Sequence, residues 1–305
     1  MGSTFKGEQI VSTIITTFKR SDSLRNAIYS VLDQTYKNIE VIVVDDNNND
    51  NYRENVKRIM SEFSADQRVH YIQHKKNMNG AVARNTGIKV ATGDFITFLD
   101  DDDTFHKKRF ELLIPELAAS NRSCGLIFSG FSYVRSKKEY KIKKVTIPKN
   151  VTTELLKTRF DIGSGSNFIM KREVLNCLQG FDSKFLRHQD LEFLVRVSEK
   201  FNFISVDANL LNIELEDSHQ NKLDIDRLIK TKKQYIDKFH YLITPQNSKS
   251  IINSHLEDIV YQIFLNGQEK EYAYVLKKYI EMNKTSYVMK ISYLYLKALL
   301  KKYIM

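Results

Sequence analysis

The chain has 305 residues, enough for one large domain or two ordinary ones, and 42% of them are apolar, as is usual for globular proteins. Its eleven glycines and three prolines exclude collagen-like and low-complexity architectures, and its two cysteines exclude a disulfide scaffold. No segment approaches the roughly 18 uncharged apolar residues of a membrane-spanning helix, and residues 1–9 lack the apolar core of a signal peptide, so we expect a cytoplasmic protein.

The net charge of +10 is concentrated near the C-terminus. Residues 218–305 hold 15 Lys or Arg against 8 Asp or Glu, which is a net +7 of the total. Such a bias is typical of proteins that bind nucleic acid or an anionic membrane surface, but it can also serve solubility alone. Solubility is the default interpretation.

The first hundred residues alternate between short β-branched runs and segments with helical spacing of apolar residues. Strands are predicted at residues 10–17, 39–44, 69–72 and 95–99, and helices at 24–32, 50–63 and 80–90. Ser21 or Asp22 can cap the first helix and Asp50 the second. This alternation predicts an α/β protein with a mostly parallel sheet covered by helices on both faces.

The remainder of the chain changes character near residue 215. Strands are predicted at 126–134, 141–147 and 167–170, and helices at 172–178, 191–200, 235–242, 251–265, 269–282 and 288–303. We therefore expect two domains, an α/β domain over residues 1–215 and a helical C-terminal region over residues 216–305.

Polar groups follow three of the predicted strands: Thr16-Thr17, Asp45-Asp46 and the run from Asp100 to Asp103. Ligands of open parallel sheets bind outside the carboxyl ends of the strands. Four adjacent carboxylates repel one another unless a cation lies among them, and such oxygen clusters suit Mg²⁺ or Mn²⁺, which can hold a diphosphate. The alternative is a solvated acidic turn that caps the next helix. Neither a G-x-G-x-x-G sequence nor a P-loop follows the first strand.

These residues belong to a series of ordered motifs. They are Thr16-Thr17-Phe18-Lys19-Arg20, Val44-Asp45-Asp46-Asn47, Asn79-Gly80 with Ala83-Arg84-Asn85-Thr86-Gly87, Phe98-Leu99 with Asp100 to Asp103, Gly180-Phe181-Asp182, and Gln189-Asp190 with the residues up to Arg196. The series resembles family 2 glycosyltransferases, and it covers residues 9–206. The resemblance implies the GT-A fold, in which a Rossmann-like, mostly parallel sheet is flanked by helices.

The resemblance also implies how the donor nucleotide is held. Asp46 would accept the N3–H of a uracil base, since a carboxylate at a strand end is a good acceptor for an imide. Thr16 would contact the nucleoside. Arg84 would pair with the diphosphate, because a guanidinium fork suits phosphate oxygens. Asn79 and Gly80 would shape the turn that brings the chain close to the ligand.

The acidic run implies a metal site for Mn²⁺ or Mg²⁺. By resemblance, Asp100 and Asp102 form an Asp-x-Asp pair, with Asp102 as the direct metal ligand and Asp100 also near the nucleotide. The four consecutive Asp residues leave the register open, because Asp101 and Asp103 form an equally spaced pair.

The resemblance assigns the catalytic base to Asp190. In the family, a Glu usually precedes this Asp, whereas this chain has Gln189. Asp190 can also cap the following helix. Glu192 is the second candidate for the base.

The implied activity is that of a metal-dependent inverting glycosyltransferase of the hexosyltransferase class. It would move one sugar from a nucleotide sugar, which we take to be a UDP-sugar, to a hydroxyl of a glycan or a lipid-linked acceptor during synthesis of a surface polysaccharide. The Gln-x-x-Arg-Trp motif of processive synthases is missing, and the chain has no Trp. Two alternatives are a sugar-1-phosphate nucleotidyltransferase and a non-enzymatic basic protein that binds nucleic acid. The first would need a Gly-rich phosphate loop after the first strand, where residues 16–21 contain no Gly. The second would need basic residues interleaved with aromatics; the C-terminal Tyr/Lys pattern is only a faint version of this and the acidic cluster opposes it, so we expect no nucleic-acid partner.

The last predicted helix has two interpretations. In residues 287–305, Lys290, Lys297 and Lys301 fall on one stripe of an apolar, Tyr-rich helix. Such a helix can lie in an anionic membrane surface, which would place the protein peripherally on the inner face of the plasma membrane. It can equally be a helix that packs against the catalytic domain.

Overall fold

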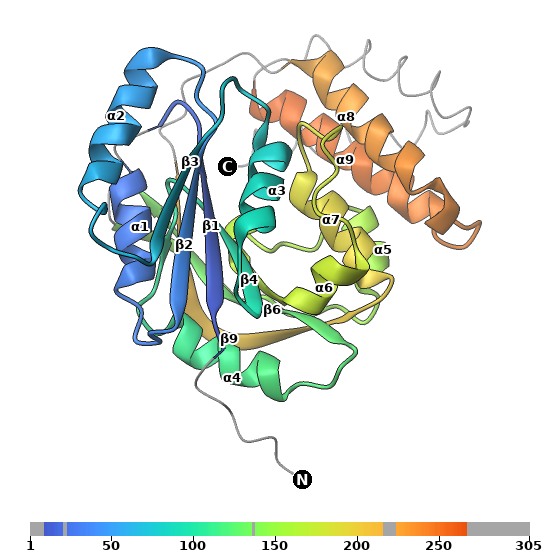
Figure 1. Ribbon diagram of the computed structural model, residues 1–305. Coiled ribbons are helices and arrows are strands. Elements are labelled where there is room, and N and C mark those ends of the chain that lie inside the picture. Colours follow the sequence, from blue (N-terminus) through green and yellow to red (C-terminus); the bar gives the residue numbers. More distant parts are fainter. Residues whose placement is uncertain (1–8, 21–22, 136–137, 216–223, 267–305) are drawn as a thin grey trace. The chain divides into compact units, whose positions relative to one another are not determined.

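The computed structural model describes residues 9–20, 23–135, 138–215 and 224–266 (Figure 1). The chain divides into two compact units. The N-terminal unit consists of Met1–Val151 and Asp161–Glu216, and the C-terminal unit consists of Thr152–Phe160 and Asp217–Met305. Residues 152–160 thus cluster with the end of the chain, although the last strands of the N-terminal unit follow them in sequence.

The N-terminal unit is built on a nine-stranded sheet. The strands are β1 (Val11–Thr17), β2 (Ile39–Asp45), β3 (Val69–Gln73), β4 (Phe95–Asp100), β5 (Thr104–Phe105), β6 (Cys124–Arg135), β7 (Lys138–Lys143), β8 (Phe168–Lys171) and β9 (Asn202–Glu214). They lie in the order β3-β2-β1-β4-β8-β6-β9-β5, and β7 pairs with β6. Strands β1 to β4 are parallel, as are β6 and β9, whereas β8 runs antiparallel to both neighbours. The predicted parallel arrangement is confirmed for β1 to β4, while the antiparallel pairings of β5, β7 and β8 make the sheet as a whole mixed.

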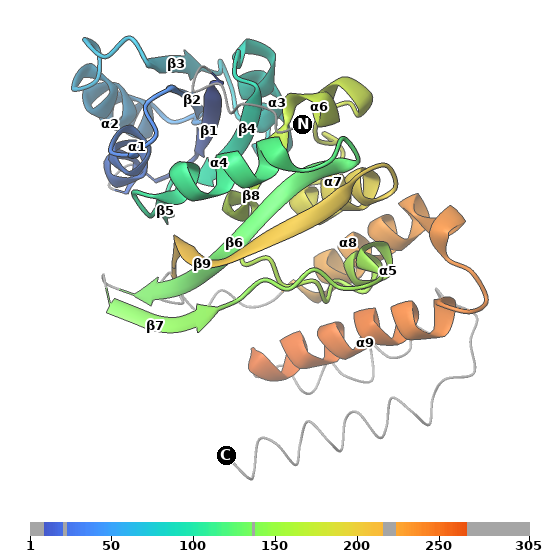
Figure 2. The same cartoon turned by 90° about the horizontal axis from the view of Figure 1, so that it is seen from below.

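Helices flank this sheet. They are α1 (Leu24–Leu32), α2 (Asp50–Ser61), α3 (Gly80–Val90), α4 (Arg109–Ala119), α6 (Arg172–Cys177) and α7 (Gln189–Ser198), with a 3₁₀ turn η1 (Gly165–Asn167) before β8. Helix α3 packs on β1 and β2, and α4 lies along β6 and β9 (Figure 2). Every residue of β2 is buried, as its β-branched composition predicts for a strand covered on both faces. The α/β architecture is therefore as expected.

Several elements differ from the sequence-based expectations. Strand β9 is not predicted from the sequence, because its Asn and Asp residues interrupt the apolar pattern. Its pairing with β6 over most of its length nevertheless makes it a strand. The strand expected at 141–147 is β7, which begins at Lys138. The N-cap of α2 is Asn49, not Asp50, and that of α1 is Ser23, while the expected caps at 21 and 22 lie outside the described residues.

The C-terminal unit contains α5 (Val151–Leu156), α8 (Ile225–Lys238), η2 (His240–Leu242) and α9 (Ser248–Leu265). Of α5, the residues from Thr152 onward belong to this unit. Helices α8 and α9 share an apolar cluster of buried Ile225, Ile229, Leu256, Ile259 and Ile263. The helix expected at 235–242 is in fact the end of α8 followed by η2, and those expected at 269–282 and 288–303 lie outside the described residues. In the part of the chain that is described, no helix combines the length and the apolar character needed to cross a membrane.

Candidate functional site

The candidate site lies at the carboxyl edge of the parallel strands. Strand β1 lies between β2 and β4, with Thr17 opposite Asp45 and Thr16 opposite Asp100. The register therefore brings the polar ends of three strands together, as the sequence predicts. Thr16 is partly exposed there, whereas Thr17 is buried.

The four Asp residues alternate between an outer and an inner pair. The side chains of Asp100 and Asp102 are 32% and 18% exposed. Those of Asp101 and Asp103 are buried. The outer pair is the more accessible to a ligand, which favours Asp100 and Asp102 as the Asp-x-Asp pair.

The inner carboxyl groups are held by the protein. Asp103 Oδ2 accepts hydrogen bonds from the hydroxyl groups of Ser164 and Ser166 at 2.8 and 2.6 Å. Burial, reinforced by the charges of Asp100 and Asp102, raises the pKa of Asp103 well above its ordinary value. Burial likewise raises the pKa of Asp101 to about 7. The inner pair thus carries less negative charge than four ionised carboxylates would place here.

Two arginines balance the outer pair. Arg20 forms an ion pair with Asp102. Arg84, from α3, donates from Nη2 to Asp100 Oδ1 at 2.8 Å and from Nη1 to Gln189 Oε1 at 2.9 Å. Its guanidinium also lies 5.5 Å from the ring centre of Phe181. Because Gln189 is neutral, it anchors Arg84 without adding a carboxylate, which leaves the cation suited to an incoming anion.

Asp190 lies in the first turn of α7, next to the same arginine. A Cβ atom on Gly165 would lie 3.7 Å from both Arg84 Nη2 and Asp190 Cβ, so these groups converge on one point. Burial raises the pKa of Asp190 above its ordinary value, although the Arg84 charge and backbone N–H groups act in the opposite direction. A raised pKa suits a carboxylate that accepts a proton.

The structure corrects one interpretation of Asp190 and distinguishes it from Glu192. The N-cap of α7 is His188, at φ 56°, so Asp190 is not the cap. The side chain of Glu192 is fully buried and accepts two hydrogen bonds from Arg196, at 2.6 and 2.9 Å. Glu192 therefore has a structural role, and Asp190 is the better candidate for the base.

Asn79 and Asn85 fix the ends of the segment that carries Arg84. Asn79, at φ 80°, is the N-cap of α3, where its Oδ1 accepts from the N–H groups of Ala81 and Val82. Asn85 bonds to both the N–H and the carbonyl of Phe181, each at 2.8 Å. The predicted turn at Asn79 is thus a helix cap, and Asn85 joins α3 to the loop before α7.

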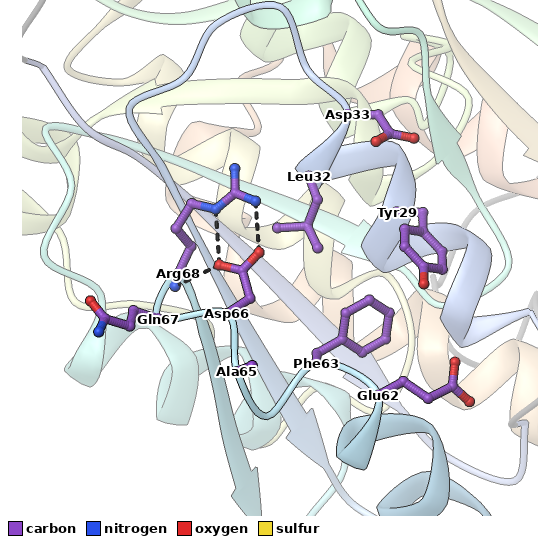
Figure 3. A pocket seen from close by; sticks show the side chains of 9 residues that line it. All are labelled: Tyr29, Leu32, Asp33, Glu62, Phe63, Ala65, Asp66, Gln67 and Arg68. Carbon is purple, nitrogen blue, oxygen red and sulfur yellow. Dashed lines mark hydrogen bonds and ion pairs between the residues drawn. The ribbon is translucent and has the colours of Figure 1, made fainter.

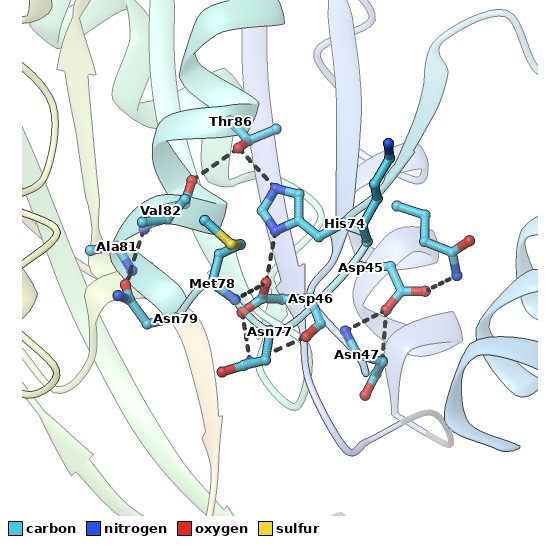
Figure 4. A network of polar contacts seen from close by, with 12 residues as sticks. Asp45, Asp46, Asn47, His74, Asn77, Met78, Asn79, Ala81, Val82 and Thr86 are labelled. Carbon is cyan, nitrogen blue, oxygen red and sulfur yellow. Dashed lines mark hydrogen bonds and ion pairs between the residues drawn. The ribbon is translucent and has the colours of Figure 1, made fainter. Parts of the chain in front are cut away.

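Asp46 lies at the end of β2 in a dense polar network (Figure 4). Its carboxylate accepts from His74 Nδ1 at 2.7 Å, from the N–H of Met78 at 2.8 Å and from Asn77 Nδ2 at 2.8 Å. The side chain is only 3% exposed. Of the expected nucleotide-binding residues, Asp46 is the most enclosed.

A divalent metal fits the outer carboxylate pair. No group of three or more His, Cys, Asp or Glu side chains suited to a metal occurs among the described residues. Mg²⁺ and Mn²⁺ are, however, commonly held by one or two carboxylates together with substrate phosphates. Asp100 and Asp102 supply two carboxylates on the accessible side of the run, and Arg84 lies beside them for the phosphates.

A separate cavity of about 530 Å³ lies between α1 and the segment before β3 (Figure 3). It is lined by Tyr29, Leu32, Asp33, Glu62, Phe63, Ala65, Asp66, Gln67 and Arg68. None of these is one of the expected site residues. The cavity is therefore separate from the candidate site.

The fold and this edge of the sheet define the protein class. It is a glycosyltransferase with the GT-A fold. The chain belongs to glycosyl transferase family 2, whose family model matches residues 12–179, more than half of its length.

Curated relatives include glycosyltransferases of polysaccharide synthesis. The chain is 28% identical over 211 residues to the amylovoran biosynthesis glycosyltransferase AmsB of Erwinia amylovora, covering 67% of this chain and 69% of AmsB. It is 26% identical over 228 residues to the UDP-Glc:alpha-D-GlcNAc-diphosphoundecaprenol beta-1,3-glucosyltransferase WfgD of Escherichia coli, covering 75% and 85%. It is 42% identical over 123 residues, 40% of this chain, to an uncharacterized glycosyltransferase of Rickettsia felis, but spans only 19% of that protein.

Solved structures share the fold at low identity. TarS 1-349 of S. aureus in complex with UDP-GlcNAc has a TM-score of 0.56 at 16% identity, covering 82% of this chain and 80% of that one. The mannosyltransferase PcManGT of Pyrobaculum calidifontis, in complex with GDP-Man and Mn²⁺, has a TM-score of 0.58 at 17% identity, covering 95% and 86%. At these identities the likeness establishes the fold alone.

Sequence reasoning missed four contributors to the site. They are Arg20, His74, Ser164 and Ser166. Arg20 stands in a recognised motif without an assigned role, and Ser164 and Ser166 belong to none of the recognised motifs. His74 shows no metal-ligand spacing, and its contact with Asp46 joins residues 28 positions apart. No local pattern indicates such a contact.

Proposed function

We propose that the protein is an inverting glycosyltransferase that moves one sugar from a UDP-sugar to a hydroxyl group of a glycan or lipid-linked acceptor. The observation that carries this proposal is the convergence of Asp190 with the Arg84–Asp100 pair beside Gly165. It places a carboxylate of raised pKa next to a cation and an accessible acidic pair. These are the groups that a displacement at a sugar diphosphate needs.

The donor would lie along the carboxyl edge. Asp46 would receive the base, Thr16 the nucleoside and Arg84 the diphosphate, while Asn79 holds the start of α3 through its cap. A nucleotide-sugar donor is supported by the complex of TarS with UDP-GlcNAc and that of PcManGT with GDP-Man.

Asp100 and Asp102 would hold the divalent metal, Mn²⁺ or Mg²⁺. When bound, such an ion stabilises negative charge on the diphosphate leaving group. Arg84 adds a fixed cation next to the same group. The complex of PcManGT contains Mn²⁺, which supports a metal of this kind.

Asp190 would remove the proton from the acceptor hydroxyl as its oxygen attacks the anomeric carbon. The nucleoside diphosphate leaves from the opposite face, so the configuration inverts. Asp190 is partly exposed and can meet a substrate, whereas Glu192 is enclosed and paired. A single base without a second carboxylate acting as nucleophile is consistent with inversion.

The acceptor would belong to a bacterial surface polysaccharide. This proposal is supported by the activities of AmsB, a glycosyltransferase of amylovoran biosynthesis, and of WfgD, which acts on a diphosphoundecaprenol-linked sugar. A lipid-linked acceptor would be met at the inner face of the plasma membrane, where residues 287–305 would supply peripheral contact. Binding to anionic vesicles should then fall when these residues are removed, and unchanged binding would refute the membrane contact.

The test of the function is release of UDP from a panel of UDP-sugars in the presence of Mn²⁺ and a lipid-linked saccharide acceptor. We expect release with at least one sugar, and a loss of about 10²–10⁴-fold in Asp190→Asn, the usual contribution of a positioned base. The variant should keep its melting temperature and its affinity for UDP. Asp207→Asn, at an exposed pair with Lys144, is the matched control and should keep full activity. A fully active Asp190→Asn variant would refute the assignment.

A further inference from the structure

The two carboxylates at the end of β2 differ in how many donors they receive. Asp45 accepts four hydrogen bonds: Oδ1 from the N–H and Nδ2 of Asn47 at 2.9 and 2.8 Å, and Oδ2 from the Tyr71 hydroxyl at 2.8 Å and Gln73 Nε2 at 3.2 Å. An ionised carboxylate offers about four acceptor positions. Asp45 is therefore saturated and can accept nothing from a ligand.

Asp46 receives three donors from the described residues. Oδ1 accepts from His74 Nδ1 and from the N–H of Met78, whereas Oδ2 accepts only from Asn77 Nδ2 (Figure 4). Within the described part of the chain, one acceptor position is left, and it belongs to Oδ2. Asp46 can thus take one donor from a ligand, and that donor must approach Oδ2.

His74 is held firmly in this arrangement. Because a carboxylate only accepts, the Nδ1 atom that faces Asp46 must carry a hydrogen. The other ring nitrogen lies 2.9 Å from Thr86 Oγ1 on α3, and the main-chain carbonyl of His74 accepts from Arg53 at 2.9 Å. The imidazole therefore joins the end of β2 to α3 and fixes the orientation of the Asp46 carboxylate.

We propose that His74 is a positioning residue that sets base selectivity, by occupying Oδ1 of Asp46 and leaving Oδ2 for a base with a single imide N–H. Uracil and thymine present one such N–H between two carbonyl groups. Guanine presents two adjacent donors, its ring N–H and its amino group, which match a carboxylate with both oxygens available. This inference rests on the proposed function and deepens it, since the related structures contain both UDP-GlcNAc and GDP-Man.

The enclosure of Asp46 makes this discrimination strong. Its side chain is 3% exposed, so solvent does little to compensate a donor left without an acceptor. Guanine would leave its second donor facing the occupied Oδ1. Cytosine and adenine present an unprotonated ring nitrogen, whose lone pair faces the carboxylate. Sites that hydrogen-bond a substrate group discriminate against analogues for the same reason.

The experiment measures affinities of the full chain for UDP, GDP and CDP by calorimetry with Mg²⁺. The key variant is His74→Phe, which keeps a ring but removes the donor to Oδ1. His74→Gln, whose amide can donate, is the conservative variant. His70→Phe is the matched control, because His70 lies in β3, four residues before His74, with a side chain that is 52% exposed.

We expect the wild type to bind UDP at least about tenfold more tightly than GDP or CDP, the factor for one hydrogen bond to a charged group. His74→Phe should reduce the ratio of UDP to GDP affinity by about tenfold, because Oδ1 becomes available to guanine. His74→Gln should recover part of the ratio, and His70→Phe should leave it unchanged.

Three results would overturn the inference. Equal losses of UDP and GDP affinity in His74→Phe would show a structural role without selectivity. A wild type that prefers GDP would contradict the base assignment, while a sugar transferase would still stand. A wild type that binds none of the nucleotides would contradict the proposed function as well.

Discussion

Asp190 and Glu192 stand two residues apart in one helix but have different environments. Glu192 is buried and its charge is neutralised by Arg196, whereas Asp190 is partly exposed next to Arg84 and Asp100. Sequence spacing shows that the two side chains point in different directions, but not which one faces the site. That distinction depends on the packing of α7 and on Gly165 of η1, which has no side chain to cover Asp190.

The raised pKa of Asp190 predicts an acid limb in the rate profile. Transfer needs the ionised carboxylate, so the rate falls as the pH drops through the pKa of Asp190. That fall should occur at a higher pH than for an ordinary Asp, whose pKa is about 3.9. Because Arg84 lowers this pKa, Arg84→Gln should move the limb to higher pH. The measurement is kcat/KM against pH, and a limb that does not move in the variant would contradict the assignment.

At the scale of elements, the sequence predicts what depends on local pattern. Strands β1, β2 and β4 and helix α3 were predicted within one or two residues, because their apolar periodicity and their caps are local. Strand β9 was not, because its pairing with β6 decides its conformation. The site divides in the same way: the motif residues could be predicted, but the inner and outer orientations of the acidic run follow from burial.

The contact between α3 and β1 predicts that replacing a glycine of α3 by alanine destabilises the protein. Replacing Gly by Ala inside a helix ordinarily stabilises it by about 0.5–1 kcal/mol. At Gly87, however, a Cβ atom would lie 2.4 Å from Ile14 Cγ2, so the helix would have to move away from the strand. Gly87→Ala should therefore lower the free energy of unfolding by about 1–3 kcal/mol in urea denaturation. Lys89→Ala, at an exposed position of the same helix, should have little effect, and a stabilised Gly87→Ala variant would contradict this packing.

At the scale of the whole molecule, the C-terminal unit holds a buried histidine. His255 lies 2.7 Å through Nε2 from the carbonyl of Leu156, and its neighbours include the Lys232–Asp258 ion pair. Burial, assisted by the charge of Lys232, lowers the pKa of His255 to about 4. The folded unit therefore favours the neutral ring, whereas the unfolded chain binds a proton below about pH 6.5.

This difference predicts that the C-terminal unit loses stability in acid. The contribution of His255 is complete above about pH 6.5 and declines as the pH falls toward 4, by about 2 kcal/mol between pH 7 and pH 5. His255→Gln keeps a donor for Leu156 but does not titrate. The decrease in Tm from pH 7 to pH 5 should be smaller in this variant than in the wild type. Equal decreases would show that His255 does not carry the effect.

The central claim is that a nucleotide and a divalent metal meet at Asp100 and Asp102. Calorimetric titration of UDP, with and without Mn²⁺, tests it most directly. We predict metal-dependent binding by the wild type, its loss in Asp102→Ala, and its retention in Asp101→Asn, because the Asp101 carboxyl is buried and its pKa, raised to about 7, reduces the charge that the substitution removes. Unchanged binding in Asp102→Ala together with loss in Asp101→Asn would contradict the account and move the metal pair to Asp101 and Asp103.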